Sequence, residues 1–341
     1  MNYILKDENA QYFECGFSCD NAIFLKLGSE AFFITDARYT TEATQTIQNA
    51  EVVLGDRRDL LKTVRLMVRK SGISRLVYNP SEWSVDAYER LSSTLNVHFQ
   101  RKVNFSQEKR IVKSEAELTL LKQAARYGKE AFARFGEFLK THEGLDEKRA
   151  FFEAEAIFKN EGALGLSFDP IVAFGENAAK PHALPTGKRL EHGELVLLDA
   201  GVKYRRYCSD RTRTSYFDEH FGFEKEQHFN DARRQKVYDT VLFAQEAALK
   251  AVRAGIQAKD IDKAARDVIE KAGFGTYFVH STGHGVGLDI HELPVIGARS
   301  SAIIDENMVF TIEPGIYLPG EFGVRIEDTI VVRANGAEVL G

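Results

Sequence analysis

The stretch HSTGHGVGLDIHELP, residues 280–294, places His280, His284 and His291 within twelve positions of one another, and the chain has nine histidines in all. Imidazole nitrogens bind divalent metals and also transfer protons, so the stretch predicts a metal or catalytic site. In zinc proteases a His-x3-His pair lies on one face of a helix. Here three interleaved glycines would each cost a helix about 1 kcal/mol relative to alanine. We therefore expect a strand or loop to present these histidines, with further ligands from elsewhere in the chain.

Two aspartates are candidates for those further ligands. Asp199 ends the apolar run at 195–198, and Asp210 lies eleven positions later in YCSDRTRT. A two-residue turn at Tyr204 and Arg205 predicts a hairpin with Asp199 directly opposite Asp210, with Cβ atoms about 4.5–5.5 Å apart. Two carboxylates this close repel each other unless a proton or cation lies between them. The alternative is a pair of surface aspartates at an ordinary hairpin.

Two glutamates repeat this pattern near the end of the chain. Glu313 follows the apolar run MVFTI, and Glu327 lies in VRIEDTIVV. Either residue alone also fits a strand position that faces solvent. Taken together, two aspartates, two glutamates and one histidine have the composition of a dinuclear metal site. A set rich in oxygen with one imidazole suits Mn²⁺, Co²⁺ or Fe²⁺ at least as well as Zn²⁺.

The elements that must position these residues fall into two groups. NAIFLKL and AFFIT read as strands joined by the turn GSE, a helix is expected to end at Gly72, and RLVYNP and VHFQRKVNF read as further strands. This pattern predicts a smaller α/β domain, which we place at residues 1–112.

A second domain is expected from residue 113 to residue 341. Ser114 and Glu117 form a capping-box pattern at the start of a helix. Further helices are expected at 146–161, 233–254 and 259–272, and strands at PIVAF, ELVLLDAG, RYCSDRTRTSYF, MVFTIEP and VRIEDTIVV. Helices grouped around strands that are mostly connected as hairpins predict an α+β domain.

Composition excludes several classes of protein. The 341 residues carry a net charge of -5, which gives no reason to expect nucleic acid as a partner. No apolar run approaches the roughly 18 residues of a membrane span, and no secretory signal is visible, so we expect a cytoplasmic protein. Cys15, Cys19 and Cys208 are few and odd in number, which suits a reducing compartment, and we expect free thiols.

The sequence resembles the pita-bread metallopeptidases, a family that includes methionine aminopeptidase, Xaa-Pro aminopeptidase and Xaa-Pro dipeptidase (prolidase). LLDAG, SDRTRT, HSTGHGVGLDIHE, TIEPGIY and VRIEDT follow one another in the order of that family's signature stretches. The resemblance implies a pita-bread catalytic domain at 113–341 that binds two divalent ions, Mn first and Co, Fe or Zn as alternatives. The implied metal ligands are Asp199, Asp210, His284, Glu313 and Glu327.

Two further stretches resemble the proline-specific branch of the family. PHALPTG at 181–187 carries His182, and DARYT at 36–40 resembles the creatinase-type N-terminal domain, which methionine aminopeptidases lack. The resemblance implies that His280 and His291 line the substrate side and that His182 and His291 bind the scissile carbonyl. It also implies that Glu313 transfers a proton and that Arg325 holds a ligand carboxylate. The alternatives are a surface salt bridge for Arg325 and a structural role for His280.

These features imply an Xaa-Pro peptidase whose substrates are peptides with proline at the second position. Prolidases often have an arginine directly after the His-Glu-x-Pro stretch, where this chain has Val295, and the nearest downstream arginine is Arg299. This departure favours an aminopeptidase, with prolidase as the alternative. Arg206 lies where relatives often have glycine, which puts the turn type in doubt.

A non-catalytic peptide-binding member of the fold and a creatinase-like hydrolase are the rival interpretations. Both normally lack metal ligands, and all five are present here. By resemblance alone we also expect a homodimer formed through the N-terminal domain.

Overall fold

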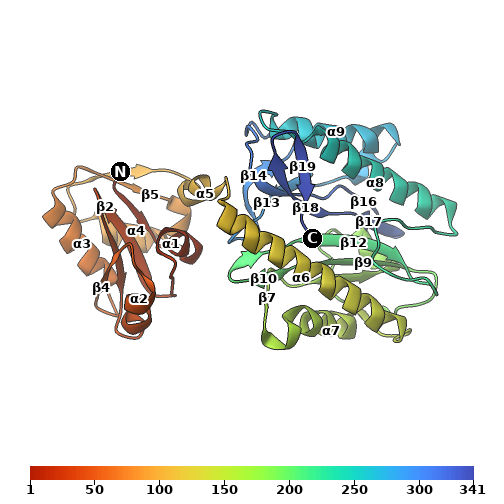
Figure 1. The fold of residues 1–341 in the computed structure, drawn as a ribbon, viewed down its shortest axis with the longest axis horizontal. Helices are drawn as coiled ribbons and strands as arrows, with labels where there is room; N and C mark the ends of the chain where they lie inside the picture. The colour runs from red at the N-terminus through yellow and green to blue at the C-terminus, as the bar shows by residue number, and fades with distance from the viewer. The chain divides into compact units, whose positions relative to one another are not determined.

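A computed structural model describes all residues, 1–341, and the chain divides into two compact units. The N-terminal unit is Met1–Arg110 and the C-terminal unit is Ile111–Gly341. Figure 1 shows a sheet with flanking helices in each of them. None of the helices combines the length and the apolar character needed to cross a membrane.

The N-terminal unit is built on a six-stranded mixed sheet with the strand order β4-β3-β2-β1-β5-β6. β2 and β3 form the hairpin expected from NAIFLKL and AFFIT, with Leu27 paired to Glu30 across the turn. The strands are β1 (Tyr3–Leu5), β2 (Ala22–Leu27), β3 (Glu30–Thr35), β4 (Glu51–Leu54), β5 (Arg75–Tyr78) and β6 (His98–Arg101).

Helices cover both faces of this sheet because its strands are apolar on both sides. On β2, Phe24 packs into one core cluster and Leu25 into the other. Gly72 ends α3 in the left-handed conformation at φ 64°, as the sequence predicted. The helices are α1 (Glu8–Cys15), α2 (Thr40–Thr46), α3 (Leu60–Ser71), η1 (Pro80–Glu82), α4 (Val85–Ser92) and α5 (Phe105–Arg110).

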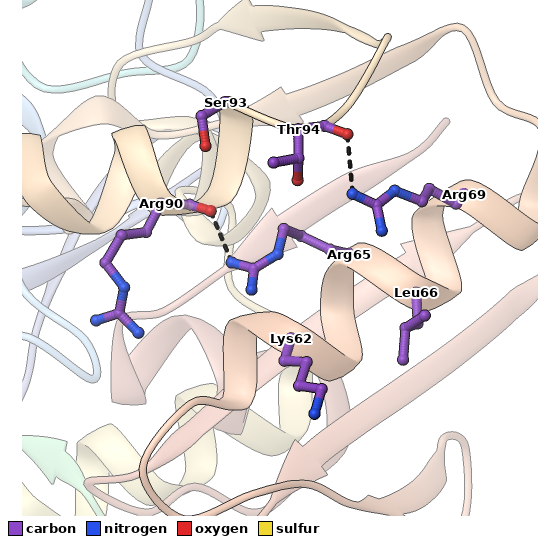
Figure 2. Close-up of a pocket in the computed structure, with 7 residues that line it drawn as sticks. All are labelled: Lys62, Arg65, Leu66, Arg69, Arg90, Ser93 and Thr94. Carbon is purple, nitrogen blue, oxygen red and sulfur yellow. Dashed lines mark hydrogen bonds between the residues drawn. The ribbon is translucent and has the colours of Figure 1, made fainter.

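Basic side chains of α3 line a shallow cleft of about 430 Å³ beside α4 (Figure 2). The guanidinium of Arg65 donates to the carbonyl of Arg90 at 2.7 Å, and that of Arg69 donates to the carbonyl of Thr94 at 3.0 Å. These carbonyls lie at or just beyond the C-terminus of α4, where cations are favourable. The arginines therefore tie two helices together, and Figure 2 shows the Lys62 and Arg90 side chains pointing away from these bonds.

The C-terminal unit begins with α6, whose capping box is formed as predicted. The Ser114 backbone N–H donates to the Glu117 carboxylate at 2.8 Å, and the Ser114 hydroxyl caps the helix in return. The helices are α6 (Glu115–Lys140), α7 (Glu147–Lys159), η2 (Asn160–Gly162), η3 (Gly175–Ala179), α8 (Ala232–Ala251), α9 (Ala258–Lys271) and η4 (Gly275–Tyr277).

The strands of this unit form several small antiparallel sheets, including β12-β9-β8 and β14-β13-β15-β18-β19. They are β7 (Gly165–Leu166), β8 (Ile171–Phe174), β9 (Leu195–Ala200), β10 (Val202–Tyr204), β11 (Tyr207–Cys208), β12 (Arg211–Tyr216), β13 (Gly283–Gly285), β14 (Glu292–Ile296), β15 (Val309–Ile312), β16 (Gly315–Leu318), β17 (Phe322–Arg325), β18 (Asp328–Arg333) and β19 (Gly336–Val339).

Two helix pairs enclose these strands, one pair on each side in Figure 1. One core cluster joins α6 and α7 to β8 and β9, and it includes Phe135, Phe158 and Val196. The other joins α8 and α9 to β15 and β18, and it includes Val241, Ile261 and Phe310. The unit is therefore a layered α+β domain whose two halves each have a core of their own.

The predicted register of the hairpin that carries the aspartates is wrong by two residues. Tyr204 pairs with Tyr207, so the turn lies at Arg205 and Arg206 instead of Tyr204 and Arg205. Both arginines have positive φ, 45° and 72°, as a type I′ turn requires. Asp199 consequently pairs with Thr212.

Asp210 therefore lies diagonal to Asp199 on the same face of the hairpin, instead of directly opposite it. The segment expected as one strand, RYCSDRTRTSYF, is divided into β11 and β12, and Asp210 lies between them.

Candidate metal centre

The five predicted metal ligands lie at strand ends or breaks of the C-terminal unit, except for His284, which lies within β13. Asp199 is in β9, Asp210 precedes β12, Glu313 follows β15 and Glu327 precedes β18. In the β15–β18 pair Ile312 lies opposite Asp328. The next step of the same register brings Glu313 opposite Glu327.

Glycines on β13 allow the neighbouring backbones to approach His284. A Cβ on Gly283 would lie 1.9 Å from the carbonyl oxygen of Thr311, and one on Gly285 would lie 2.2 Å from that of Leu293. A bulge between His284 and Gly285 shifts the register with β14, and bulges commonly re-aim side chains at functional sites. The sequence predicted that a strand or loop presents this histidine, and the structure has a strand, β13, whose glycines are required by close packing.

Four of the predicted ligands converge on a small volume. The Nε2 atom of His284 lies 3.5 Å from Oδ2 of Asp210 and 3.4 Å from Oε1 of Glu313. One ligand atom from each of Asp210, His284 and Glu327 lies within 4.8 Å of the other two. Asp210 and Glu327 are 7% and 1% exposed, which excludes the alternative that they are surface carboxylates.

The His284 ring is oriented by its other nitrogen. Nδ1 lies 3.1 Å from the carbonyl oxygen of Gly285. Donation of an Nδ1 proton to that carbonyl leaves the Nε2 lone pair directed at the carboxylates. Burial, and then the nearby His291, lower the pKa of His284 to about 4. The imidazole is therefore neutral near pH 7, which is the form that binds metals.

The carboxylates repel one another in the absence of a cation. Burial raises the pKa of Asp210 well above its usual value, and the charges of Glu327, Asp199 and Glu313 raise it further. Burial also raises the pKa of Glu327, and the charges of Glu313 and Asp199 raise it further. Burial also raises the pKa of Glu313, to about 8, although the nearby Arg325 opposes the shift. The cluster therefore requires protons or a cation to be stable.

The residues present fit a pair of divalent cations. Four carboxylates and one neutral imidazole supply the oxygen-rich donor set that such ions prefer. Oδ1 of Asp199 is buried and has no hydrogen-bond partner within the chain. A buried acceptor without a partner is costly, and a cation would satisfy it.

Two threonines link the predicted ligands to the strands beside them. The Thr311 hydroxyl accepts from the backbone N–H of His284 at 3.1 Å and donates to Glu313 at 3.2 Å. The Thr212 hydroxyl donates to Glu327 at 2.6 Å and accepts from Nε of Arg325 at 3.0 Å. Neither threonine was predicted from the sequence. Each lies two residues from a predicted ligand along the chain, and this spacing, the period of a strand, is the signal that could have found them.

Arg325 is buried, with 3% exposure, so the surface salt bridge proposed as its alternative is excluded. Its guanidinium contacts Asp199 and donates to the Tyr317 hydroxyl at 2.8 Å and the Pro181 carbonyl at 3.2 Å. Arg325 ends β17 and a break separates it from Glu327, so the two do not share one strand as expected. The expected contact of Arg325 with a carboxylate is made to Asp199.

The remaining predicted histidines lie around this cluster. Nε2 of His280 lies 2.9 Å from the Tyr317 hydroxyl, and burial lowers the pKa of His280 to about 4. The His291 ring lies edge-on to that of His284, with centroids 4.3 Å apart, and His291 is exposed. His182 is also exposed and follows Pro181, whose carbonyl is bound by Arg325.

An open cleft of about 620 Å³ adjoins His280, with Val279, Val295 and Arg299 among its lining residues. Val295 pairs with His284 across β13 and β14, so both side chains point to the same side of the sheet. The cleft therefore lies on the side of the sheet to which His284 points.

Comparisons with known proteins agree with this architecture. The profile of metallopeptidase family M24 matches residues 119–334. An uncharacterized peptidase of Bacillus subtilis is 36% identical over 338 residues, which cover 99% of this chain and 92% of that protein.

Solved structures match over the same length. An Xaa-Pro dipeptidase from Bacillus anthracis has a TM-score of 0.92 at 33% identity, covering 99% of this chain and 92% of that one. An X-Pro aminopeptidase from Thermotoga maritima has a TM-score of 0.88 at 33% identity, covering 99% and 94%. The predicted fold class, a pita-bread domain preceded by a smaller α/β domain, is confirmed.

Proposed function

This chain belongs to metallopeptidase family M24, and on that premise we propose that it is a dinuclear-metal Xaa-Pro aminopeptidase. It would release the N-terminal residue of a peptide whose second residue is proline. The observation that carries the proposal is the buried convergence of His284 with Asp210, Glu313 and Glu327.

The metal site of the proposal consists of Asp199, Asp210, His284, Glu313 and Glu327. Two divalent cations, Mn²⁺ or otherwise Co²⁺, Fe²⁺ or Zn²⁺, would supply Lewis acidity there and lower the pKa of water toward 7. Arg325 and Thr212 restrain the carboxylates of Asp199 and Glu327. Restraint of this kind by neighbouring side chains fixes ligand geometry before substrate binds.

The chain's own side chains would handle the protons and the developing charge. Glu313, whose carboxylate lies 3.4 Å from Nε2 of His284 in the cluster, would accept a proton from the attacking water and return it to the prolyl nitrogen. His182 and His291 are exposed beside the cluster, and their ring N–H groups would donate to the oxygen of the scissile carbonyl. His280, held by Tyr317, would line the same side.

A prolyl nitrogen carries no N–H, so an enzyme that cleaves before proline must recognise the ring by shape. The cleft beside His280 offers the apolar side chains of Val279 and Val295, which are 66% and 47% exposed. We assign this cleft to the proline ring and to the residue that follows it.

A dipeptidase that cleaves Xaa-Pro itself is the second candidate. It is favoured by the similarity to the structure named Xaa-Pro dipeptidase from Bacillus anthracis. The aminopeptidase is favoured by Val295, because a valine cannot bind the free carboxylate of a dipeptide. A homodimer, which rests on family resemblance, and a cytoplasmic location, which rests on the few cysteines, complete the proposal.

The deciding experiment is to quantify alanine released from Ala-Pro and from Ala-Pro-Ala by Mn²⁺-loaded protein. Release from the tripeptide alone supports the aminopeptidase, and release from the dipeptide alone supports the prolidase. Chelator-treated protein is the control, and activity that survives the chelator contradicts a metal-dependent mechanism. Absence of release from both peptides contradicts the proposed function.

A further inference from the structure

Glu147, at the start of α7, is a carboxylate with 0% exposure that does not belong to the predicted metal site. Its oxygens accept hydrogen bonds from the backbone N–H of Phe174 at 2.7 Å and the Asn177 amide at 2.9 Å. They also accept from the backbone N–H of Thr186 at 2.7 Å and the Thr186 hydroxyl at 2.5 Å. An ionised carboxylate can accept all of these bonds at once, and bonds to a charged acceptor are the stronger kind.

All of these donors belong to one segment, residues 174–186, and this segment carries His182. It begins at Phe174, the last residue of β8, and continues through η3, but residues 181–187 lie in neither a helix nor a strand. Glu147 binds the segment on both sides of His182, at Phe174 and at Thr186. Between these points Arg325 binds the carbonyl of Pro181 at 3.2 Å. The backbone next to His182 is therefore held by one buried anion and one buried cation.

We propose that Glu147 is the positioning residue for His182, and this inference rests on the proposed function. Glu147 holds the loop so that the exposed His182 ring stays beside the metal cluster and the substrate carbonyl. Because a misplacement of about 1 Å in a catalytic group can cost about 100-fold in rate, loss of this anchor lowers activity without removing any group that touches substrate.

The test is a double-mutant cycle of Glu147→Gln and His182→Ala, with kcat/KM measured on Ala-Pro-Ala and bound metal quantified. Glutamine keeps the size of the side chain but directs an NH₂ group at N–H and O–H donors. We expect Glu147→Gln to lower kcat/KM by about 10- to 100-fold with metal content unchanged. In the His182→Ala background, Glu147→Gln should lower kcat/KM by less than about 2-fold, because there is no ring left to position.

Hydrogen exchange of residues 175–187 supplies a readout that does not depend on activity. We expect faster exchange in Glu147→Gln than in the wild type. Thr186→Val is a milder second variant: it removes the hydroxyl that donates to Glu147 and accepts from the backbone N–H of Lys188, but it keeps the Thr186 N–H that also donates to Glu147. It should lower kcat/KM by a few-fold, again only when His182 is present.

Glu82→Gln in the N-terminal unit is the matched control. Glu82 likewise accepts from two backbone N–H groups, those of Lys6 and Asp7, and from the amide of Asn79. Its substitution should leave kcat/KM on Ala-Pro-Ala unchanged.

Additive losses in the cycle, or unchanged exchange of residues 175–187, would overturn the positioning role while the proposed function stands. A wild-type protein that cleaves no Xaa-Pro peptide contradicts the proposed function instead. Hydrogen exchange alone then decides whether Glu147 holds the loop.

Discussion

Thr212 joins two parts of the predicted metal site through one hydroxyl. It donates to Glu327 and accepts from Arg325, and the threonine is fully buried. Side chains that orient metal ligands commonly contribute about 10- to 100-fold to metal affinity. The predicted site therefore depends on residues that are not among its predicted ligands.

We expect Thr212→Val to weaken Mn²⁺ binding by about 10- to 100-fold, because Glu327 loses its hydroxyl donor. Titration calorimetry on metal-free protein measures this change. Thr240→Val is the matched control, since the hydroxyl of Thr240 bonds only within α8, to the carbonyl of Lys236. Equal affinities of Thr212→Val and wild type would show that the hydroxyl does not orient Glu327.

We expect Arg325→Lys to lower kcat/KM by about 10- to 100-fold, although the charge is retained. The guanidinium reaches Thr212, Tyr317, Pro181 and Asp199 at once, and a lysine ammonium cannot reproduce that planar fork. Steady-state kinetics on Ala-Pro-Ala test this. Arg333→Lys, which alters the ion pair with Glu338 at the surface, is the control. Its kcat/KM should stay within a few-fold of the wild-type value.

At the scale of the secondary-structure elements, the hairpin of β10 and β11 determines which residues face each other in the longer pair β9 and β12. Arg205 and Arg206 both adopt positive φ in its turn. A side chain in that conformation costs about 1–2 kcal/mol, and glycine avoids the cost. The turn is therefore strained locally and is held by the strands that it connects.

We expect Arg206→Gly to raise the free energy of unfolding of the C-terminal unit by about 1 kcal/mol and to leave kcat/KM unchanged. Denaturant unfolding followed by circular dichroism measures the change. The comparison variant is Arg126→Gly on the exposed face of α6. Its free energy of unfolding should fall by about 1 kcal/mol, because glycine is unfavourable in a helix interior. A destabilised Arg206→Gly would mean that the arginine's own contacts outweigh its backbone strain.

At the scale of the whole molecule, the buried carboxylates link folding to pH and to metal. In the metal-free protein the pKa of Glu313 rises from an ordinary 4.5 to about 8, and those of Asp210 and Glu327 rise as well. Between pH 4.5 and about 6.5 His280 and His284, whose pKa values are lowered from 6.5 to about 4, oppose the carboxyl groups. Above about pH 6.5 the raised carboxyl groups dominate, the folded protein binds more protons than the unfolded chain, and the free energy of unfolding must fall as pH rises toward 8.

We expect metal-free protein to lose thermal stability from about pH 6.5 to about pH 8, with Mn²⁺ restoring most of the loss at the upper end. A cation present at 100 times its Kd adds about 2.7 kcal/mol. Calorimetric Tm values with and without Mn²⁺ test this, and Glu313→Gln should flatten the slope. A metal-free protein that becomes more stable toward pH 8 would contradict the electrostatic account.

The sequence by itself determined which types of side chain form the predicted site and where several helices and strands begin or end. Carboxylates at the ends of apolar strands and a histidine among glycines are local patterns, and the capping box of Ser114 and Glu117 needs only neighbouring residues. These features could be predicted because their physical causes act within a few positions of the chain. The order of the signature stretches added the family and with it the fold class.

Only the tertiary structure decided how those residues meet. The register that pairs Asp199 with Thr212 depends on a turn whose two arginines show no glycine signal. The bond from Arg325 to Thr212 spans 113 positions, and the bonds from Glu147 span 27 to 39. Contacts between residues so far apart in the sequence depend on packing among several elements. No local periodicity predicts which strand or loop will lie beside a given side chain.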